Sequence, residues 1–159
     1  MTLLETLDQA KHSLFRFEFL QFFSVNSEKE LWRIWETEHR IADEYMQPWW
    51  DYISEKKNKG IQMQRVSLIR QPLSPYKEME MEIFKKTVHS GDEIRIIEST
   101  KFDSLNLSVK DFWLIDTNTV VILNYDSQGE WLGFETTDQT SEYLKSKQLL
   151  LKHSALLEP

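Results

Sequence analysis

The spacing of hydrophobic and polar residues changes several times along this chain of 159 residues, and each change predicts a new element. In residues 15–23 (FRFEFLQFF) aromatic residues alternate with charged ones, which favours a strand with one buried face; a helix is the alternative. Across residues 27–53 the apolar residues recur at helical intervals instead. Ser27 is the predicted N-cap, because Glu30 follows it at the spacing of a capping box.

We expect residues 27–53 to form two helices. Pro48 marks the predicted break between them, because proline fits the first turn of a helix but not its interior. Gly60 follows the second helix, at a place where a left-handed cap is favoured. Residues 1–60 are therefore expected to be a strand followed by helices.

A β-α-β unit is predicted next. Residues 61–69 and 93–98 are apolar enough to be buried strands. Between them, Ser74 is placed to cap a helix that Pro75 opens and that ends at Gly91. Two strands joined through a helix are expected to pair in parallel, with a right-handed crossover.

The last part of the chain predicts antiparallel hairpins. Residues 111–116, 119–125 and 131–136 are three short apolar runs, and turn-forming residues separate them. Thr137 or Asp138 is placed to cap a closing helix.

Together these elements predict an α+β fold with a mixed sheet and helices packed on it. A strand and helical part, residues 1–60, precedes a β-α-β-β-β-α part, residues 61–159. We expect residues 1–159 to form a single domain. Aromatic residues make up 13% of the chain, with only four Gly and four Pro, so order is expected nearly throughout.

Composition excludes several classes of protein. The chain has no Cys, which rules out disulfides and thiol chemistry, and its net charge of −7 argues against a nucleic-acid partner. Residues 1–9 lack the features of a signal peptide, and no run reaches the roughly 18 apolar residues of a membrane span. We therefore expect a cytoplasmic protein with no membrane partner.

Motifs for catalysis and for cofactors are missing. None of the four His residues has the spacing of a metal site. No nucleophile elbow and no Gly-rich phosphate loop is present. The sequence thus predicts no metal, no cofactor and no catalytic residue.

Several short strings occur in a characteristic order and spacing. They are FRFE at 15–18, RV at 65–66, PLS at 72–74 with Tyr76 and Glu80, GDEIR at 91–95, DFWLID at 111–116, and Tyr125-Asp126 with Gly129. Together they resemble the uncharacterised bacterial family known as domain of unknown function 6879, from about Leu14 to Leu156. That resemblance implies no established activity.

The order of elements in residues 92–154 also resembles, more distantly, half of the phospholipase D-like fold. Active members of that superfamily carry a His, a Lys two residues later and an Asp five residues further on. If Asp116 takes the Asp place, Val109 and Asp111 take the places of His and Lys. The resemblance therefore implies the fold with a degenerate active site and no phosphodiesterase activity. Because such halves pair, it also implies a homodimer.

A set of charged and aromatic residues is the candidate ligand site. Its members are Arg65, Tyr76, Glu80, Arg95, Asp111, Trp113 and Asp116. Arg65 and Arg95 lie within predicted strands, so we expect one of them to form an ion pair with Glu80 on the neighbouring helix. Such a network can serve packing alone. Alternatively the guanidinium groups bind a carboxylate or phosphate while Trp113 stacks, or one of the carboxylates acts as a general base.

The predicted N-terminal helices are rich in Trp. The four indoles in question belong to Trp32, Trp35, Trp49 and Trp50. At about 100° per residue they cannot all face one narrow stripe, which predicts an exposed indole and a surface for a protein partner. An ordinary aromatic core is the equally weighted alternative.

Our leading hypothesis from the sequence is a non-catalytic interaction or ligand-sensing module, regulatory in role. Its expected partners are another protein or a second copy of the chain, together with a small anionic ligand. The alternative is an enzyme that acts on a phosphate-containing or nucleic-acid substrate through the cluster of arginines and carboxylates.

Overall fold

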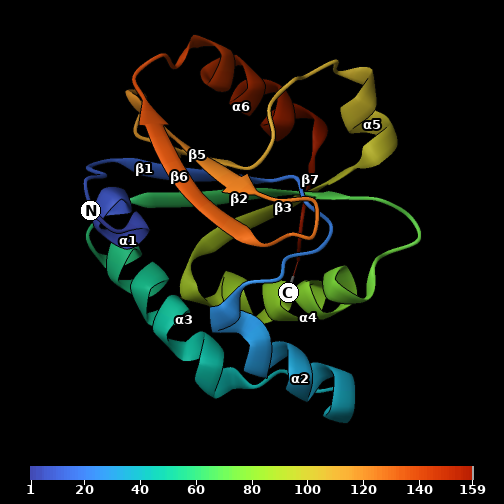
Figure 1. The fold of residues 1–159 in the computed structure, drawn as a ribbon. Coiled ribbons are helices and arrows are strands. Elements are labelled where there is room, and N and C mark those ends of the chain that lie inside the picture. The colour runs from blue at the N-terminus through green and yellow to red at the C-terminus, as the bar shows by residue number, and fades with distance from the viewer. Residues whose placement is uncertain (159) are drawn as a thin grey trace.

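The computed structural model describes residues 1–158, which build an α+β fold around a mixed sheet (Figure 1). The helices in these residues are α1 (Leu3–Leu7), α2 (Lys29–Glu38), α3 (Asp43–Asn58), α4 (Pro75–Thr87), α5 (Ser99–Ser104) and α6 (Ser141–His153), with 3-10 turns η1 (Asn26–Glu28) and η2 (Val88–Ser90). The strands are β1 (Ser13–Glu18), β2 (Gln62–Ile69), β3 (Asp92–Glu98), β4 (Phe112–Ile115), β5 (Thr119–Tyr125), β6 (Trp131–Thr137) and β7 (Ala155–Leu156).

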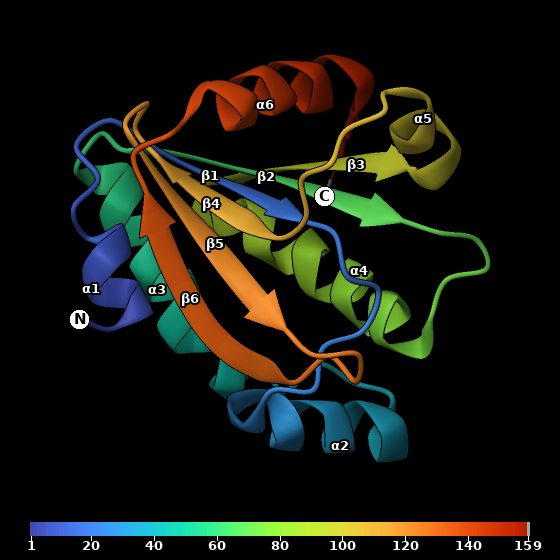
Figure 2. The same cartoon turned by 45° about the horizontal axis from the view of Figure 1, so that its top comes forward.

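The strands of the described residues form one seven-stranded sheet in the order β6-β5-β4-β1-β2-β3-β7 (Figure 2). β1, β2 and β3 are parallel, and the other pairings are antiparallel. β1 lies between β2 and β4, so the first strand of the chain is central to a sheet built mostly from later segments. Its register places Arg16 opposite both Arg65 of β2 and Trp113 of β4.

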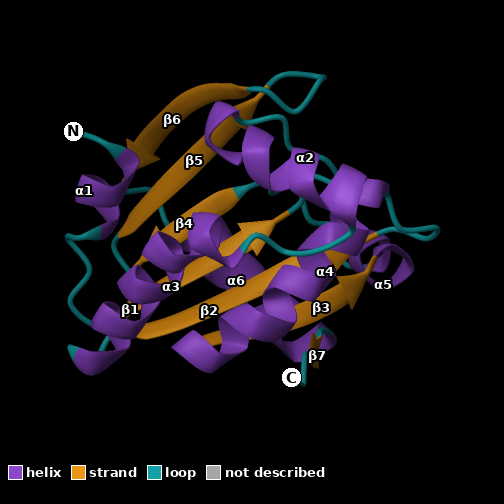
Figure 3. Ribbon diagram, turned by 90° about the horizontal axis from the view of Figure 1, so that it is seen from below, coloured by secondary structure: helices purple, strands orange, loops and turns teal. Residues whose placement is uncertain are grey.

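Helices cover both faces of the sheet. α5 and α6 lie on one face, and α1, α2, α3 and α4 lie on the other (Figures 1 and 3). Phe15 and Phe17 pack on the α5 and α6 side with Leu150, whereas Arg16 and Glu18 point to the opposite side. The prediction of a strand in residues 15–23 is confirmed for its first part, but the expectation of a single buried face is wrong, because helices cover both sides of β1.

The β-α-β unit is confirmed: β2 and β3 pair in parallel, and α4 lies between them in the sequence. The Ser74 hydroxyl accepts a hydrogen bond from the Lys77 backbone N–H at 3.1 Å, and Pro75 occupies the first turn. The predicted hairpins are also confirmed as β4, β5 and β6. The closing helix starts later than expected, because Thr137 is still paired with Val120 in the sheet.

Two predicted helix boundaries are wrong. α2 ends at His39, which adopts the left-handed conformation at φ 54°, so the break between the two helices precedes Pro48. Pro48 instead lies inside α3 at an exposed position, and it lacks the backbone N–H that other interior helical residues donate. Ser27 does not cap α2, because it belongs to the preceding 3-10 turn η1. Gly60 does follow α3 with a positive φ of 80°.

None of the helices within residues 1–158 combines the length and the apolar character that a membrane-crossing helix requires.

Candidate functional site

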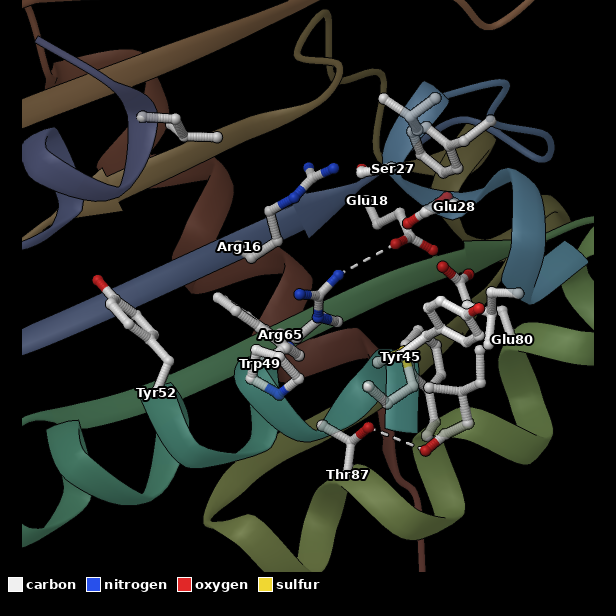
Figure 4. Close-up of a pocket in the computed structure, with 18 of the residues that line it drawn as sticks. Arg16, Glu18, Ser27, Glu28, Tyr45, Trp49, Tyr52, Arg65, Glu80 and Thr87 are labelled. Carbon is white, nitrogen blue, oxygen red and sulfur yellow. Dashed lines mark hydrogen bonds and ion pairs between the residues drawn. The ribbon is translucent and has the colours of Figure 1, made fainter. Parts of the chain in front are cut away.

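A pocket of about 540 Å³ lies between the sheet and the helices α1 to α4 (Figure 4). Its floor is the sheet, which contributes Arg16, Glu18, Arg65 and Trp113. Arg16 and Glu18 share this face because side chains alternate along a strand, and Arg65 joins them because β1 and β2 pair at that register.

Aromatic side chains form much of the wall. Trp49 of α3 stacks on Tyr52, with ring centroids 5.3 Å apart and planes 12° apart. It also meets Trp113 of the floor edge to face at 6.1 Å. Tyr76 and Phe84 of α4 line the opposite side. These rings give the pocket flat apolar surfaces above a charged floor.

The charges of the floor belong to a buried network. Arg65 donates from Nη1 to Glu18 Oε2 at 3.0 Å, and its Nε lies 3.6 Å from Asp92 Oδ2. Lys77, which has no exposed surface, contacts Glu18 and lies 2.9 Å from Glu80 Oε1. The predicted direct pair between Glu80 and Arg65 is therefore wrong, since Lys77 and Glu18 stand between them. A buried charge is costly unless an opposite charge or a hydrogen bond compensates it, and these ion pairs provide that compensation.

The carboxyl groups of the network differ in the direction of their pKa shifts. Burial opposes ionisation of Glu18. The positive charges of Lys77 and Arg65, together with a hydrogen bond from Glu80, outweigh this effect and lower the pKa of Glu18. Burial and the neighbouring charge of Glu18 raise the pKa of Glu80 well above its usual range. Burial also raises the pKa of Asp92 to about 6 against the opposing effect of Arg65. Of the two neighbouring carboxyl groups, Glu80 is thus the one whose surroundings favour the protonated form, and Glu18 the one whose surroundings favour the ionised form.

Among the buried side-chain nitrogen and oxygen atoms of residues 1–158, Asp92 Oδ1 is the one without a hydrogen-bond partner. Its carboxyl group is almost fully buried, and its other oxygen is the one that faces Arg65. A buried carboxylate with an unpaired oxygen is costly, which agrees with the raised pKa of this group.

Two further carboxyl groups flank the pocket. Asp111 Oδ1 accepts from Arg16 Nη2 at 3.2 Å and from the Phe19 backbone N–H at 3.0 Å. Glu28 Oε2 accepts from the Tyr76 hydroxyl at 2.9 Å. Burial raises the pKa of both Asp111 and Glu28, and the hydrogen bonds oppose this in part.

Two of the predicted site residues lie elsewhere. Arg95 is on the α6 side of the sheet, where its guanidinium donates to the Ser154 hydroxyl and backbone carbonyl, both at 2.9 Å. Asp116 follows β4 and accepts backbone hydrogen bonds from Lys11, His12 and Ser13 at 2.8 to 3.2 Å. Its carboxylate thus fixes the entry into β1 and does not face the pocket.

A family model described as a domain of unknown function (DUF6879) matches residues 2–158. The chain belongs to this family. The search of curated proteins found none that matches it. The short strings noted in the sequence thus identified the family correctly.

In this DUF6879 protein, the predicted residues that converge on the pocket are Arg65, Tyr76, Glu80 and Trp113, with Asp111 reaching it through Arg16. Five residues of the site and its ion network were not predicted: Arg16, Glu18, Glu28, Lys77 and Asp92. The available signal was the alternation of Arg16 and Glu18 with Phe residues in a predicted strand. If helices cover both faces of such a strand, its charged side chains are buried as well as its Phe side chains. No group of three or more acidic or His side chains within residues 1–158 is arranged to hold a metal ion.

The four Trp residues of the N-terminal helices are less exposed than expected. Trp35 and Trp50 are buried, at 8% and 9% exposed, and Trp32 and Trp49 are half-buried. Trp50 donates to Thr87 Oγ1 at 2.9 Å, while Trp49 faces the pocket. Neighbouring helical positions here meet different buried surroundings, so the expected exposed indole is not among the four. A partner surface at these residues stays a prediction.

Proposed function

We propose that this DUF6879 protein is a non-catalytic ligand-sensing module that binds a small molecule in the pocket between the sheet and α1 to α4. The observation that carries the proposal is the pocket itself, with aromatic walls above a floor that holds Arg16, Glu18 and Arg65. A volume of about 540 Å³, mostly apolar surroundings and a few convergent polar groups are typical of small-molecule sites.

The ion network supports binding over catalysis. Each of the cations Arg16, Arg65 and Lys77 is already held by at least one carboxyl group. Side chains fixed in this way present a rigid floor, which lowers the cost of ordering groups when a ligand binds.

The test is thermal unfolding in the presence of a panel of small aromatic compounds. Binding to the folded state raises the melting temperature, because the ligand stabilises only that state. Trp49→Leu, which changes the pocket wall, should abolish the shift, whereas Trp131→Leu on β6, outside the pocket, should retain it. A compound that stabilises both variants equally would show that binding does not use this pocket.

A rival proposal is an enzyme that acts on a phosphate-containing or nucleic-acid substrate. The observation in its favour is that the pKa of Glu80 is raised while the pKa of the neighbouring Glu18 is lowered, and both side chains line the pocket. Two carboxyl groups in different protonation states are the arrangement that acid–base catalysis uses. Turnover of a phosphodiester that Glu80→Gln abolishes, with folding retained, would favour the enzyme.

The distant likeness to the phospholipase D-like fold is kept as a proposal without activity. Val109 and Asp111 still stand where that chemistry requires His and Lys, and Asp116 is engaged by the backbone of the segment before β1. We accordingly propose no phosphodiester chemistry at this region.

A protein partner or a homodimer remains part of the proposal. Light scattering at micromolar concentration would reveal a dimer, and Trp49→Ala should weaken it if the half-buried face of α3 contributes. A chain that stays monomeric would contradict the homodimer.

A further inference from the structure

We propose that the pocket selects an uncharged, planar aromatic molecule with an amide-like polar edge, and that it discriminates against both anions and cations of the same shape. This inference rests on the proposed ligand-binding function and specifies its ligand class. It departs from the sequence-based expectation of a small anionic ligand.

The first step concerns anions. Arg16 and Arg65 line the pocket, and Lys77 lies buried next to Glu18. These three cations contact four carboxyl groups: Arg16 pairs with Asp111, Arg65 with Glu18 and Asp92, and Lys77 with Glu18 and Glu80. An anionic ligand would thus meet no cation that lacks an acidic partner within residues 1–158. Its charge would have to lie close to the carboxylates that already neutralise these cations, or displace one of them and leave it without its own compensation.

The second step concerns cations. Acidic and aromatic side chains attract cations, but the Arg65 guanidinium already lies over two of the aromatic rings that line the pocket. Arg65 Cζ lies 5.7 Å from the Phe84 ring centroid and 5.9 Å from the Trp113 ring centroid. A cationic ligand would have to approach Arg65 at close range, and like charges repel strongly in a poorly solvated pocket.

The third step concerns shape. Trp49 lies flat against Tyr52 and edge-on to Trp113, so its ring offers a planar surface beside the charged floor. Aromatic rings prefer offset-stacked or edge-to-face neighbours, and an added ring can satisfy either geometry here. A flat ligand therefore gains contact area without changes in the wall.

The fourth step concerns the polar edge of the ligand. Arg65 Nη1 is committed to Glu18, whereas Nη2 has no hydrogen-bond acceptor among the described residues. Figure 4 shows the second terminal nitrogen of Arg65 turned away from Glu18. Glu28 accepts the Tyr76 hydroxyl through one oxygen only, and its carboxyl group also lines the pocket. Both residues line the pocket, so a neutral ligand that carries a carbonyl and an N–H can offer an acceptor to Arg65 and a donor to Glu28.

The experiment uses three probes of nearly one shape: benzamide, benzoate and benzamidinium. Binding is measured by isothermal titration calorimetry at pH 7. We expect the dissociation constant of benzamide to be lower than that of either charged probe by about tenfold or more, because only the neutral probe leaves the ion network undisturbed.

A matched pair of variants links this preference to the polar edge. Glu28→Ala should weaken benzamide binding severalfold, while Glu30→Ala on the solvent side of α2 should leave it unchanged. Tighter binding of benzoate or benzamidinium would overturn the inference about charge and leave the proposed ligand-binding function standing. If none of the three probes binds up to its solubility limit, the inference about the ligand class is overturned, whereas the proposed ligand-binding function is decided separately by the thermal-unfolding panel.

Discussion

At the scale of single residues, acidic side chains of the same type have opposite roles in this structure. Lys77 and Arg65 lower the pKa of Glu18 against the effect of burial, whereas burial and the charge of Glu18 raise the pKa of Glu80. Asp116 accepts backbone N–H groups and has a lowered pKa, although burial opposes ionisation. Each role depends on the partners that the fold provides, so residue type alone does not predict it.

Asp116 is expected to stabilise the fold without contributing to chemistry. Asp116→Ala removes the acceptor for the backbone N–H groups of Lys11, His12 and Ser13, and should lower the free energy of unfolding by about 1–3 kcal/mol. Urea denaturation measures this. Asp138→Ala, at an exposed position after β6, is the control and should change stability by less than about 0.5 kcal/mol. An equal loss in the two variants would contradict the role of Asp116.

Asp92 should make stability fall as the pH rises. Because the pKa of Asp92 increases from 3.8 to about 6 on folding, the folded state binds more protons than the unfolded state between these values. Ionisation of Asp92 should therefore cost about 3 kcal/mol by pH 7. Asp92→Asn cannot ionise, so its stability relative to the wild type should rise between pH 4 and pH 7.

Denaturant titrations of both proteins at several pH values provide the measurement for Asp92→Asn. A stability difference that stays constant from pH 4 to pH 7, or one that falls, would show that the Asp92 carboxyl group titrates as it does in the unfolded chain.

At the scale of elements, α4 is tied to the centre of the sheet through Lys77. Lys77→Met removes one of the two cations that pair with the buried Glu18 and leaves Arg65 as the other. The substitution should lower the free energy of unfolding by about 3–5 kcal/mol. Glu80→Gln should cost less than about 1 kcal/mol, because the amide has the shape of the protonated acid and both hydrogen-bonding functions. Chemical denaturation compares the two variants. A larger loss for Glu80→Gln than for Lys77→Met would mean that Glu80 carries the negative charge.

The elements whose sequence signals are local could be predicted. Ser74 and Pro75 mark the start of α4, and turn residues mark the hairpins of β4, β5 and β6. Boundaries that depend on tertiary contacts could not. The break between α2 and α3 lies at His39, whose left-handed conformation ends α2, so Pro48 falls within α3. Strand pairing through Thr137 likewise delayed the start of α6.

At the scale of the whole molecule, the candidate site depends on sheet order. Arg16 meets Arg65 and Trp113 because β1 inserts between β2 and β4, and no spacing in the sequence encodes that neighbourhood. The sequence did indicate that charges within apolar strands need partners, and it selected Arg65 and Glu80. It could not say that Arg95 faces the other side, since that follows from the register of β3 in the sheet.

Ligand binding in the pocket can be detected directly through the chemical shifts of the indole N–H groups. Trp49 and Trp113 line the pocket, whereas Trp131 lies outside it on β6. In a ¹⁵N-labelled protein titrated with benzamide, heteronuclear NMR should show saturable shifts of the Trp49 and Trp113 indole signals and a stationary Trp131 signal. A saturable shift of Trp131 with Trp49 and Trp113 unchanged, or no response of any indole, would contradict the account.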